Sequence, residues 1–193
     1  MGLDMYLKRG KKIPKVSWEE YKEIRNRVLQ DDKDTMEKYK EYIVHCGDFY
    51  KWDDLVEEVG YWRKANQIHN WIVEHCQDGV DDCGLYEVSK GDLETLLFKC
   101  KSIVKCCPMI DGEVVNGYTF KDGERVPNIE KGQVMTNSYV AESILPTCSG
   151  CFFGGTNYDE YYMSAILDTI KILEKVLNET NFDEEYVCYE SSW

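Results

Sequence analysis

Residues 158–177, YDEYYMSAILDTIKILEKVL, form the clearest helical segment of the sequence. Their apolar residues recur every three or four positions, which places them on one face of an α-helix. That face contains Ala165, Ile166, Thr169, Ile170, Leu173, Val176 and Leu177. We expect it to pack on other helices and on a small sheet, because an apolar helix face must be covered.

Outward from this helix, further helices are predicted at residues 17–29, 60–76 and 89–106, and another from an N-cap at Asp32 or Asp34 to about Val44. Two of them begin with a capping box, formed by Ser17 with Glu20 and by Ser89 with Asp92. Short apolar and aromatic runs predict strands at 2–7, 85–88 and 186–189, whereas 47–59 look irregular. The residues expected to be buried between these elements include Ile68, Ile72, Leu97, Ile166 and Leu173.

Residues 109–135 are rich in glycine and contain two hairpin-turn signals, Asn116-Gly117 and Asp122-Gly123, between short β-rich runs. This pattern predicts a protruding β-hairpin insertion. The predicted fold is therefore α+β: a mostly helical single domain over residues 1–193, with a small antiparallel sheet and this hairpin.

The chain carries 36 acidic against 23 basic residues, a formal net charge of −13. Such a charge repels phosphate backbones, so direct nucleic-acid binding is disfavoured. A basic run at residues 8–12 is either a phosphate-binding segment or an ordinary solvated loop. Paired acids suggest a surface that imitates the charge of DNA towards a basic protein partner, and ordinary solubility charge is the alternative. The candidate partner-binding residues are Asp53, Asp54, Glu57, Glu58, Asp81 and Asp82.

No stretch approaches the ~18–20 apolar residues needed to span a bilayer, and the first residues lack an apolar signal core. The sequence therefore predicts a cytoplasmic protein without a membrane segment.

Nine cysteines without a secretory signal favour free thiols or metal ligands over disulfides. Only Cys148 and Cys151 have the two-residue spacer that lets two sulfurs face one tetrahedral zinc ion. These two residues are the candidate metal ligands. They form either half of a zinc site or a pair of free thiols.

Arg63, Asn66 and His69 follow one another at spacings of three within the predicted helix 60–76. We expect them to meet the glycine-rich loop that contains the other candidate pocket residues, Thr147, Thr156 and Asp159. Such a junction either holds an anionic ligand or ties the loop to the helix through hydrogen bonds.

Four segments carry a resemblance to a known group of proteins: GLDMYL at 2–7, VGYWRKANQIHNW at 59–71, VDDCG at 80–84, and LPT-x-SG-x-FFGGTNYDEYY at 145–162. They resemble an uncharacterised family of small acidic phage and prophage proteins. The resemblance implies a phage or mobile-element setting and no particular activity.

Two hypotheses follow. The first is a non-enzymatic phage or mobile-element protein that binds and inhibits a protein in the host cytoplasm. A specific form of it is an anti-CRISPR-type inhibitor, which uses its acidic surface against an RNA-guided nuclease. The alternative is a metal- or nucleotide-dependent enzyme with a pocket around Arg63, His69, Cys83 and Asp159.

Overall fold

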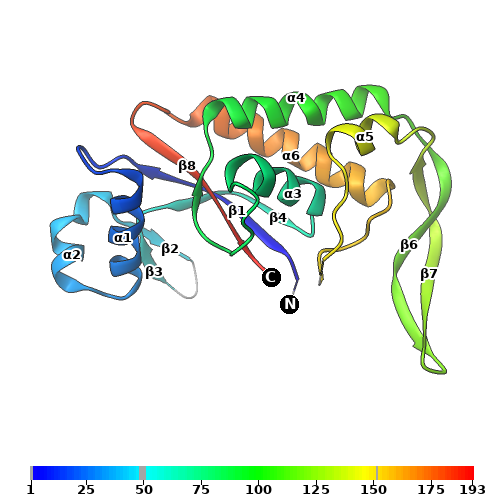
Figure 1. Cartoon of the computed structure of the whole chain (residues 1–193), viewed down its shortest axis with the longest axis horizontal. Coiled ribbons are helices and arrows are strands. Elements are labelled where there is room, and N and C mark those ends of the chain that lie inside the picture. The colour runs from blue at the N-terminus through cyan, green and yellow to red at the C-terminus, as the bar shows by residue number, and fades with distance from the viewer. Residues whose placement is uncertain (1, 48–50, 151) are drawn as a thin grey trace.

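The computed structural model describes residues 2–47, 51–150 and 152–193 of the chain. At its centre lies an antiparallel sheet with the strand order β4 (Glu57–Arg63), β1 (Asp4–Lys11), β8 (Glu185–Ser192) and β5 (Tyr86–Glu87). The first and last strands of the chain are therefore neighbours, and both ends emerge at the same side (Figure 1). The basic run at residues 8–12 is mostly part of β1, which corrects the interpretation of this run as a solvated loop.

Both faces of this sheet are covered, because side chains alternate along each strand. Leu3, Met5 and Leu7 of the amino-terminal segment point to one face and belong to the larger hydrophobic core. In β8, Val187 joins that same core, whereas Cys188 belongs to a second cluster on the opposite face.

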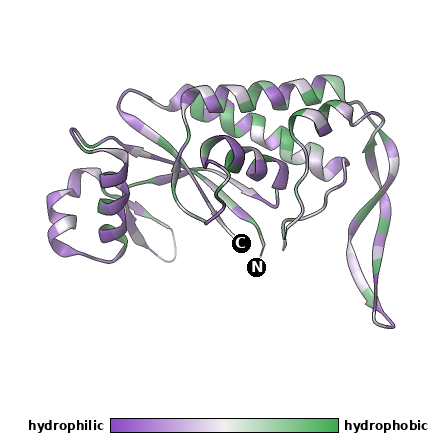
Figure 2. Cartoon of the chain, viewed as in Figure 1, coloured by the Kyte–Doolittle hydropathy of each residue, from purple (hydrophilic) through white to green (hydrophobic). Residues whose placement is uncertain are grey.

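The larger core lies under α3 (Asn66–Cys76), α4 (Lys90–Cys106), α5 (Tyr139–Ile144) and α6 (Glu160–Glu179). Figure 2 shows hydrophobic residues on these packed helices. Ile68, Ile72, Ile166 and Leu173 are buried and Leu97 is partly buried against them, which confirms the predicted helix faces. The α+β fold class is likewise confirmed.

A smaller layer covers the other face of the sheet. It is built from α1 (Trp18–Leu29), α2 (Lys33–Lys38), the 3₁₀ turn η1 (Lys40–Tyr42), β2 (Val44–Cys46) and β3 (Trp52–Asp54). The capping boxes of α1 and α4 both form, with the predicted pairs of residues.

Three sequence predictions are corrected by the structure. The helix expected at 60–76 begins only at Asn66, because residues 57–63 pair with β1 as strand β4. Gly60 of that strand lies against α6, where a Cβ would approach Ile172 Cγ2 to 2.4 Å, so a larger residue would push the two elements apart. The helix expected from Asp32 or Asp34 to about Val44 is capped by Asp32 and ends at Lys38, and part of the segment expected to be irregular forms β3.

The hairpin is formed by β6 (Met109–Lys121) and β7 (Glu124–Met135), joined at Asp122-Gly123. It projects from the helical end of the molecule (Figure 1). The second turn signal, Asn116-Gly117, is instead a register shift within β6, where Gly117 has a φ of 77°. A bulge of this kind uses glycine because a side chain would disfavour a positive φ.

A charged network connects the smaller layer to the sheet. Arg25 of α1 donates to both carboxylate oxygens of Asp54 in β3, at 2.7 and 2.9 Å, and to Glu190 in β8 at 3.1 Å. Lys8 of β1 donates to the same Glu190. Asp54 is only 1% exposed, and the Arg25 side chain is 7% exposed. Burial alone would lower the pKa of Arg25, but the hydrogen bonds to Asp54 and Glu190 outweigh it and raise that pKa.

We expect Arg25→Met to lower the free energy of unfolding by about 3–5 kcal/mol, because it strands the buried Asp54 carboxylate without its partner. The matched control is Arg27→Met on the exposed side of the same helix, which should change stability little. Chemical denaturation of both variants measures the difference. Equal stability of the two variants would contradict the structural role of the buried pair.

Glu190 makes this network sensitive to acid. Burial of Glu190 opposes its ionisation, but hydrogen bonds from Arg25 and Lys8 prevail and hold its pKa below the ordinary value. A depressed pKa in the folded state means that the stabilisation is present above the unfolded-state pKa, ~4.3 for glutamate, and is lost as the pH falls through the folded-state value. Denaturation at neutral and at acidic pH should therefore show a smaller acid-induced loss of stability in Glu190→Gln than in the unaltered protein. An identical acid-induced loss in both proteins would disprove this linkage.

Candidate functional site

The amide of Asn66, at the start of α3, binds the glycine-rich loop that precedes α6. Its Nδ2 donates to the carbonyl oxygens of Phe153 and Gly155, at 3.2 and 2.9 Å. Its Oδ1 accepts the backbone N–H of Cys148 at 2.9 Å. Asn66 is buried, so its side chain replaces the water that would otherwise satisfy these backbone groups.

His69, one turn further along α3, is only 2% exposed and lies in a second set of contacts. Its Nδ1 is 2.7 Å from the hydroxyl of Tyr189 and its Nε2 is 3.0 Å from a carboxylate oxygen of Asp81. The ring of Phe153 meets the imidazole edge-on. Trp193 donates from Nε1 to the other oxygen of Asp81 at 3.1 Å. His69 thus links the helix, the glycine-rich loop and the carboxyl-terminal strand.

The other candidate pocket residues hold the loop closed upon itself. The hydroxyl of Thr147 donates to the carbonyl of Thr156 at 3.1 Å, and its backbone N–H donates to the Tyr158 hydroxyl. Asp159 is the N-cap of α6 and accepts from the amides of Tyr161 and Tyr162. Burial raises the pKa of Asp159, against the opposing effect of those amides.

Arg63 lies apart from this junction. It belongs to β4 rather than to α3, its side chain is 61% exposed, and its closest carboxylate partner is Asp4 at 3.8 Å. Cys83 lies in the turn before β5, with a φ of 58°. Of the four residues of the enzyme hypothesis, Arg63, His69, Cys83 and Asp159, Arg63 therefore lies on an exposed strand position away from the buried His69. The contacts of Asn66, Thr147 and Thr156 match a structural tie between helix and loop.

Two residues beside the junction have left-handed backbone angles, Lys64 with a φ of 60° and Phe152 with a φ of 64°. Such angles cost a non-glycine residue about 1–2 kcal/mol. Leu3 holds both residues in place, since its carbonyl accepts from the Lys64 amide and its own amide donates to the Phe152 carbonyl. The amino-terminal strand therefore secures the loop from the other side.

The candidate acidic surface is divided by the fold. Asp54 is buried against Arg25, which removes it from any partner-binding surface. Asp53 contacts His45, and Glu57 forms an ion pair with Arg9 at 2.7 Å. Asp82 accepts from the amide of Gly84 at 2.8 Å and from the Tyr86 hydroxyl at 3.0 Å. Asp81 is held by His69 and Trp193. Among the described residues, Glu58 is thus the exposed candidate whose carboxylate has neither an ion pair nor a hydrogen bond.

The zinc half-site stays a prediction, because Cys151 lies outside the described residues. Burial raises the pKa of Cys148 above its ordinary value, and nearby Asp81 and Glu74 add to this effect. A raised pKa disfavours the thiolate that binds zinc. Over residues 2–47, 51–150 and 152–193, no three His, Cys, Asp or Glu side chains are placed to share a metal ion.

The hairpin carries exposed apolar and aromatic side chains that the charge pattern of the sequence did not indicate as a contact surface. Tyr118 and Phe120 of β6 are paired with Pro127 and Arg125 of β7, so these side chains share one face of the hairpin. Ile129 continues that face because it lies two residues beyond Pro127. We call these five residues the hairpin face. Phe120 is 77% exposed, and Tyr118 and Ile129 are exposed as well. The alternation of large apolar residues beside a turn was the available sequence signal.

The hairpin face is preorganised by local contacts. The guanidinium of Arg125 lies 3.7 Å from the centroid of the Tyr118 ring, in a cation–π arrangement. At the base of the hairpin, Tyr161 of α6 donates to Glu130 at 2.7 Å, and Glu160 accepts the amide of Gln133 at 2.8 Å. These contacts anchor the base and leave the outer half free of the helices, as Figure 1 shows.

No protein-family model matches this chain, and neither a curated protein nor a solved structure matches it. The resemblance to phage proteins therefore remains a prediction. Within the described residues, no helix is long and apolar enough to cross a membrane.

Asn66→Ala should detach the glycine-rich loop from α3. We expect the amide of Cys148 to exchange with solvent faster, and the free energy of unfolding to fall by about 1–3 kcal/mol, because buried backbone groups lose their partners. Hydrogen-exchange mass spectrometry and denaturation measure the two effects. Asn26→Ala, at an exposed position of α1, is the control. Unchanged exchange in the loop of Asn66→Ala would disprove the tie.

Proposed function

We propose that this chain is a non-enzymatic phage or mobile-element protein that binds and inhibits a host protein, and that the hairpin face makes the contact. The observation that carries the proposal is the exposure of Tyr118, Phe120 and Ile129 together on an arm anchored only at its base. A contiguous patch of exposed apolar and aromatic residues usually marks an interaction site, and aromatic residues are enriched among those that contribute most to binding energy.

The face of the hairpin is a better contact than its edge. Pro127 has no backbone N–H, and Lys131 places a charge further along β7. Both features discourage the addition of another strand. Tyrosine and arginine are also the residue types that contribute most to interface energies, and here Arg125 and Tyr118 are already stacked.

The negative charge has a separate role in this proposal. A net charge of −13 accelerates encounter with a basic partner, whereas the apolar contact sets how long the complex lasts. A nuclease with a basic nucleic-acid channel, such as an RNA-guided nuclease, is the class of partner that this combination suits. The hairpin itself carries five acids and three bases, so it has the same sign as the whole chain.

The test replaces one exposed phenylalanine at a time. Phe120→Ser should weaken binding to the target at least about tenfold, since central aromatic residues of an interface contribute about 2 kcal/mol or more. The matched control is Phe98→Ser on α4, because Phe98 is 73% exposed and lies outside the hairpin. A photo-crosslinker at position 120 first identifies the target in host lysate, and binding and nuclease inhibition are then measured with purified proteins.

Association should slow as salt rises, because the electrostatic attraction is screened over about 8 Å at physiological ionic strength. Glu58→Lys should slow association without a large change in dissociation. Full binding by a chain that lacks residues 115–129 would refute the hairpin contact. Binding lost equally in Phe120→Ser and Phe98→Ser would have the same consequence.

A further inference from the structure

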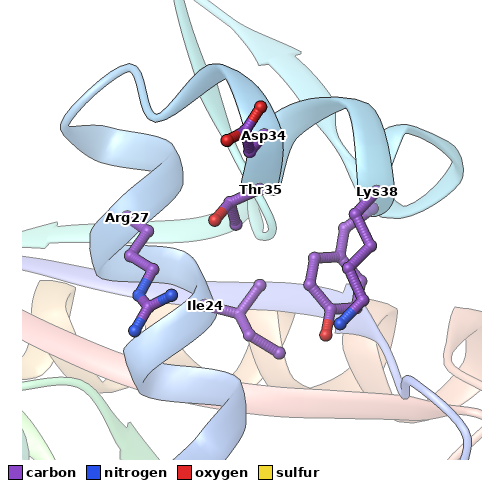
Figure 3. A pocket seen from close by; sticks show the side chains of 6 residues that line it. Ile24, Arg27, Asp34, Thr35 and Lys38 are labelled. Carbon is purple, nitrogen blue, oxygen red and sulfur yellow. The ribbon is translucent and has the colours of Figure 1, made fainter.

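A small pocket lies between α1 and α2, apart from the hairpin and from the glycine-rich loop. It has a volume of about 240 Å³ and is lined by Ile24, Arg27, Asp34, Thr35, Lys38 and Tyr39 (Figure 3). Drug-sized ligands need about 300–1,000 Å³, so this pocket accommodates only a small group.

The lining is cationic on a strongly acidic protein. Figure 3 shows Arg27 and Lys38 on opposite sides of Ile24, with Thr35 between them and the Asp34 carboxylate pointing away from Ile24. Within the part of the chain that the structure describes, no carboxylate lies within 4.0 Å of either cation. The neighbouring Asp32 carboxylate accepts the amides of Asp34 and Thr35 at 3.1 and 3.2 Å.

The floor of the pocket is apolar and aromatic. Ile24 is partly buried, and Tyr39 packs against the second hydrophobic cluster. The ammonium of Lys38 lies 4.8 Å from the centroid of the Tyr39 ring, which holds the charge at the rim. Two positive groups thus stand over a surface suited to a small organic moiety.

We propose that this pocket binds a phosphate monoester whose organic part is small and apolar. The planar guanidinium of Arg27 provides paired donors that match phosphate geometry, and Lys38 provides a second positive charge. Ile24 and Tyr39 pack against the organic part. A dianion suits two cations, and the acidic remainder of the surface opposes binding elsewhere. This inference does not depend on the proposed partner-binding function.

The test titrates the protein with phenyl phosphate and follows backbone amide signals by NMR. We expect saturable shifts confined to residues of α1 and α2 that line the pocket. Arg27→Gln and Lys38→Gln should each weaken binding about tenfold or more, since a hydrogen bond to a charged group contributes about 1.5–3 kcal/mol. Lys38→Arg should retain most of the affinity because it keeps the charge.

Lys33→Gln is the matched control, because Lys33 is an exposed lysine of the same helix that does not line the pocket. Its affinity should equal that of the unaltered protein. Equal weakening in Lys33→Gln and Lys38→Gln, equal binding of the neutral analogue benzyl alcohol, or no saturable shift would each overturn the proposal. Unchanged spectra outside α1 and α2 verify that the variants are folded.

Discussion

The charged network of Arg25 with Asp54 and Glu190 is the interaction on which the packing of the smaller layer on the sheet depends. It joins α1 to β3, and Glu190 extends it to the sheet. Removing charges from water is costly, so such a pair is retained only where both partners are well placed, and here Arg25 reaches both oxygens of Asp54. The bidentate geometry orients α1 relative to β3, and the bonds from Arg25 to Glu190 orient it relative to β8. Tyr21 of the same helix then donates to the Leu55 carbonyl at 3.0 Å, in the segment that leads into β4.

Local signals in the sequence predicted much of the fold. The capping boxes at Ser17 and Ser89 and the apolar repeat of residues 158–177 involve neighbours within four positions, so the sequence alone defines them. Strand β4 was missed because its stability comes from pairing with β1, about fifty residues earlier in the chain. The segment GYWRKAN is compatible with either a strand or an extension of α3, and only the partner strand decides between them.

The errors in the candidate site likewise arise because local sequence patterns do not show which distant strands pair. Arg63 was grouped with Asn66 and His69 by helical spacing, and the start of α3 at Asn66 separates them. Adjacent acids were treated as one surface, but Asp53 and Asp54 belong to a strand, where successive side chains point to opposite sides. One is therefore partly exposed and the other buried. Asn66 and His69 were placed beside the glycine-rich loop correctly, because that loop must cover the apolar face on which both residues lie.

The distribution of charge shows how a strongly acidic chain presents distinct surfaces. Three bases of the amino-terminal segment are used within the fold, since Lys8, Arg9 and Arg25 pair with Glu190, Glu57 and Asp54. Their neutralisation leaves the outward field to the remaining acids, which act over a distance and carry little shape information. Specific contact must then come from features that differ from this background. Two such features among the described residues are the apolar hairpin face and the cationic pocket between α1 and α2, which lie in different parts of the molecule and suit different kinds of ligand.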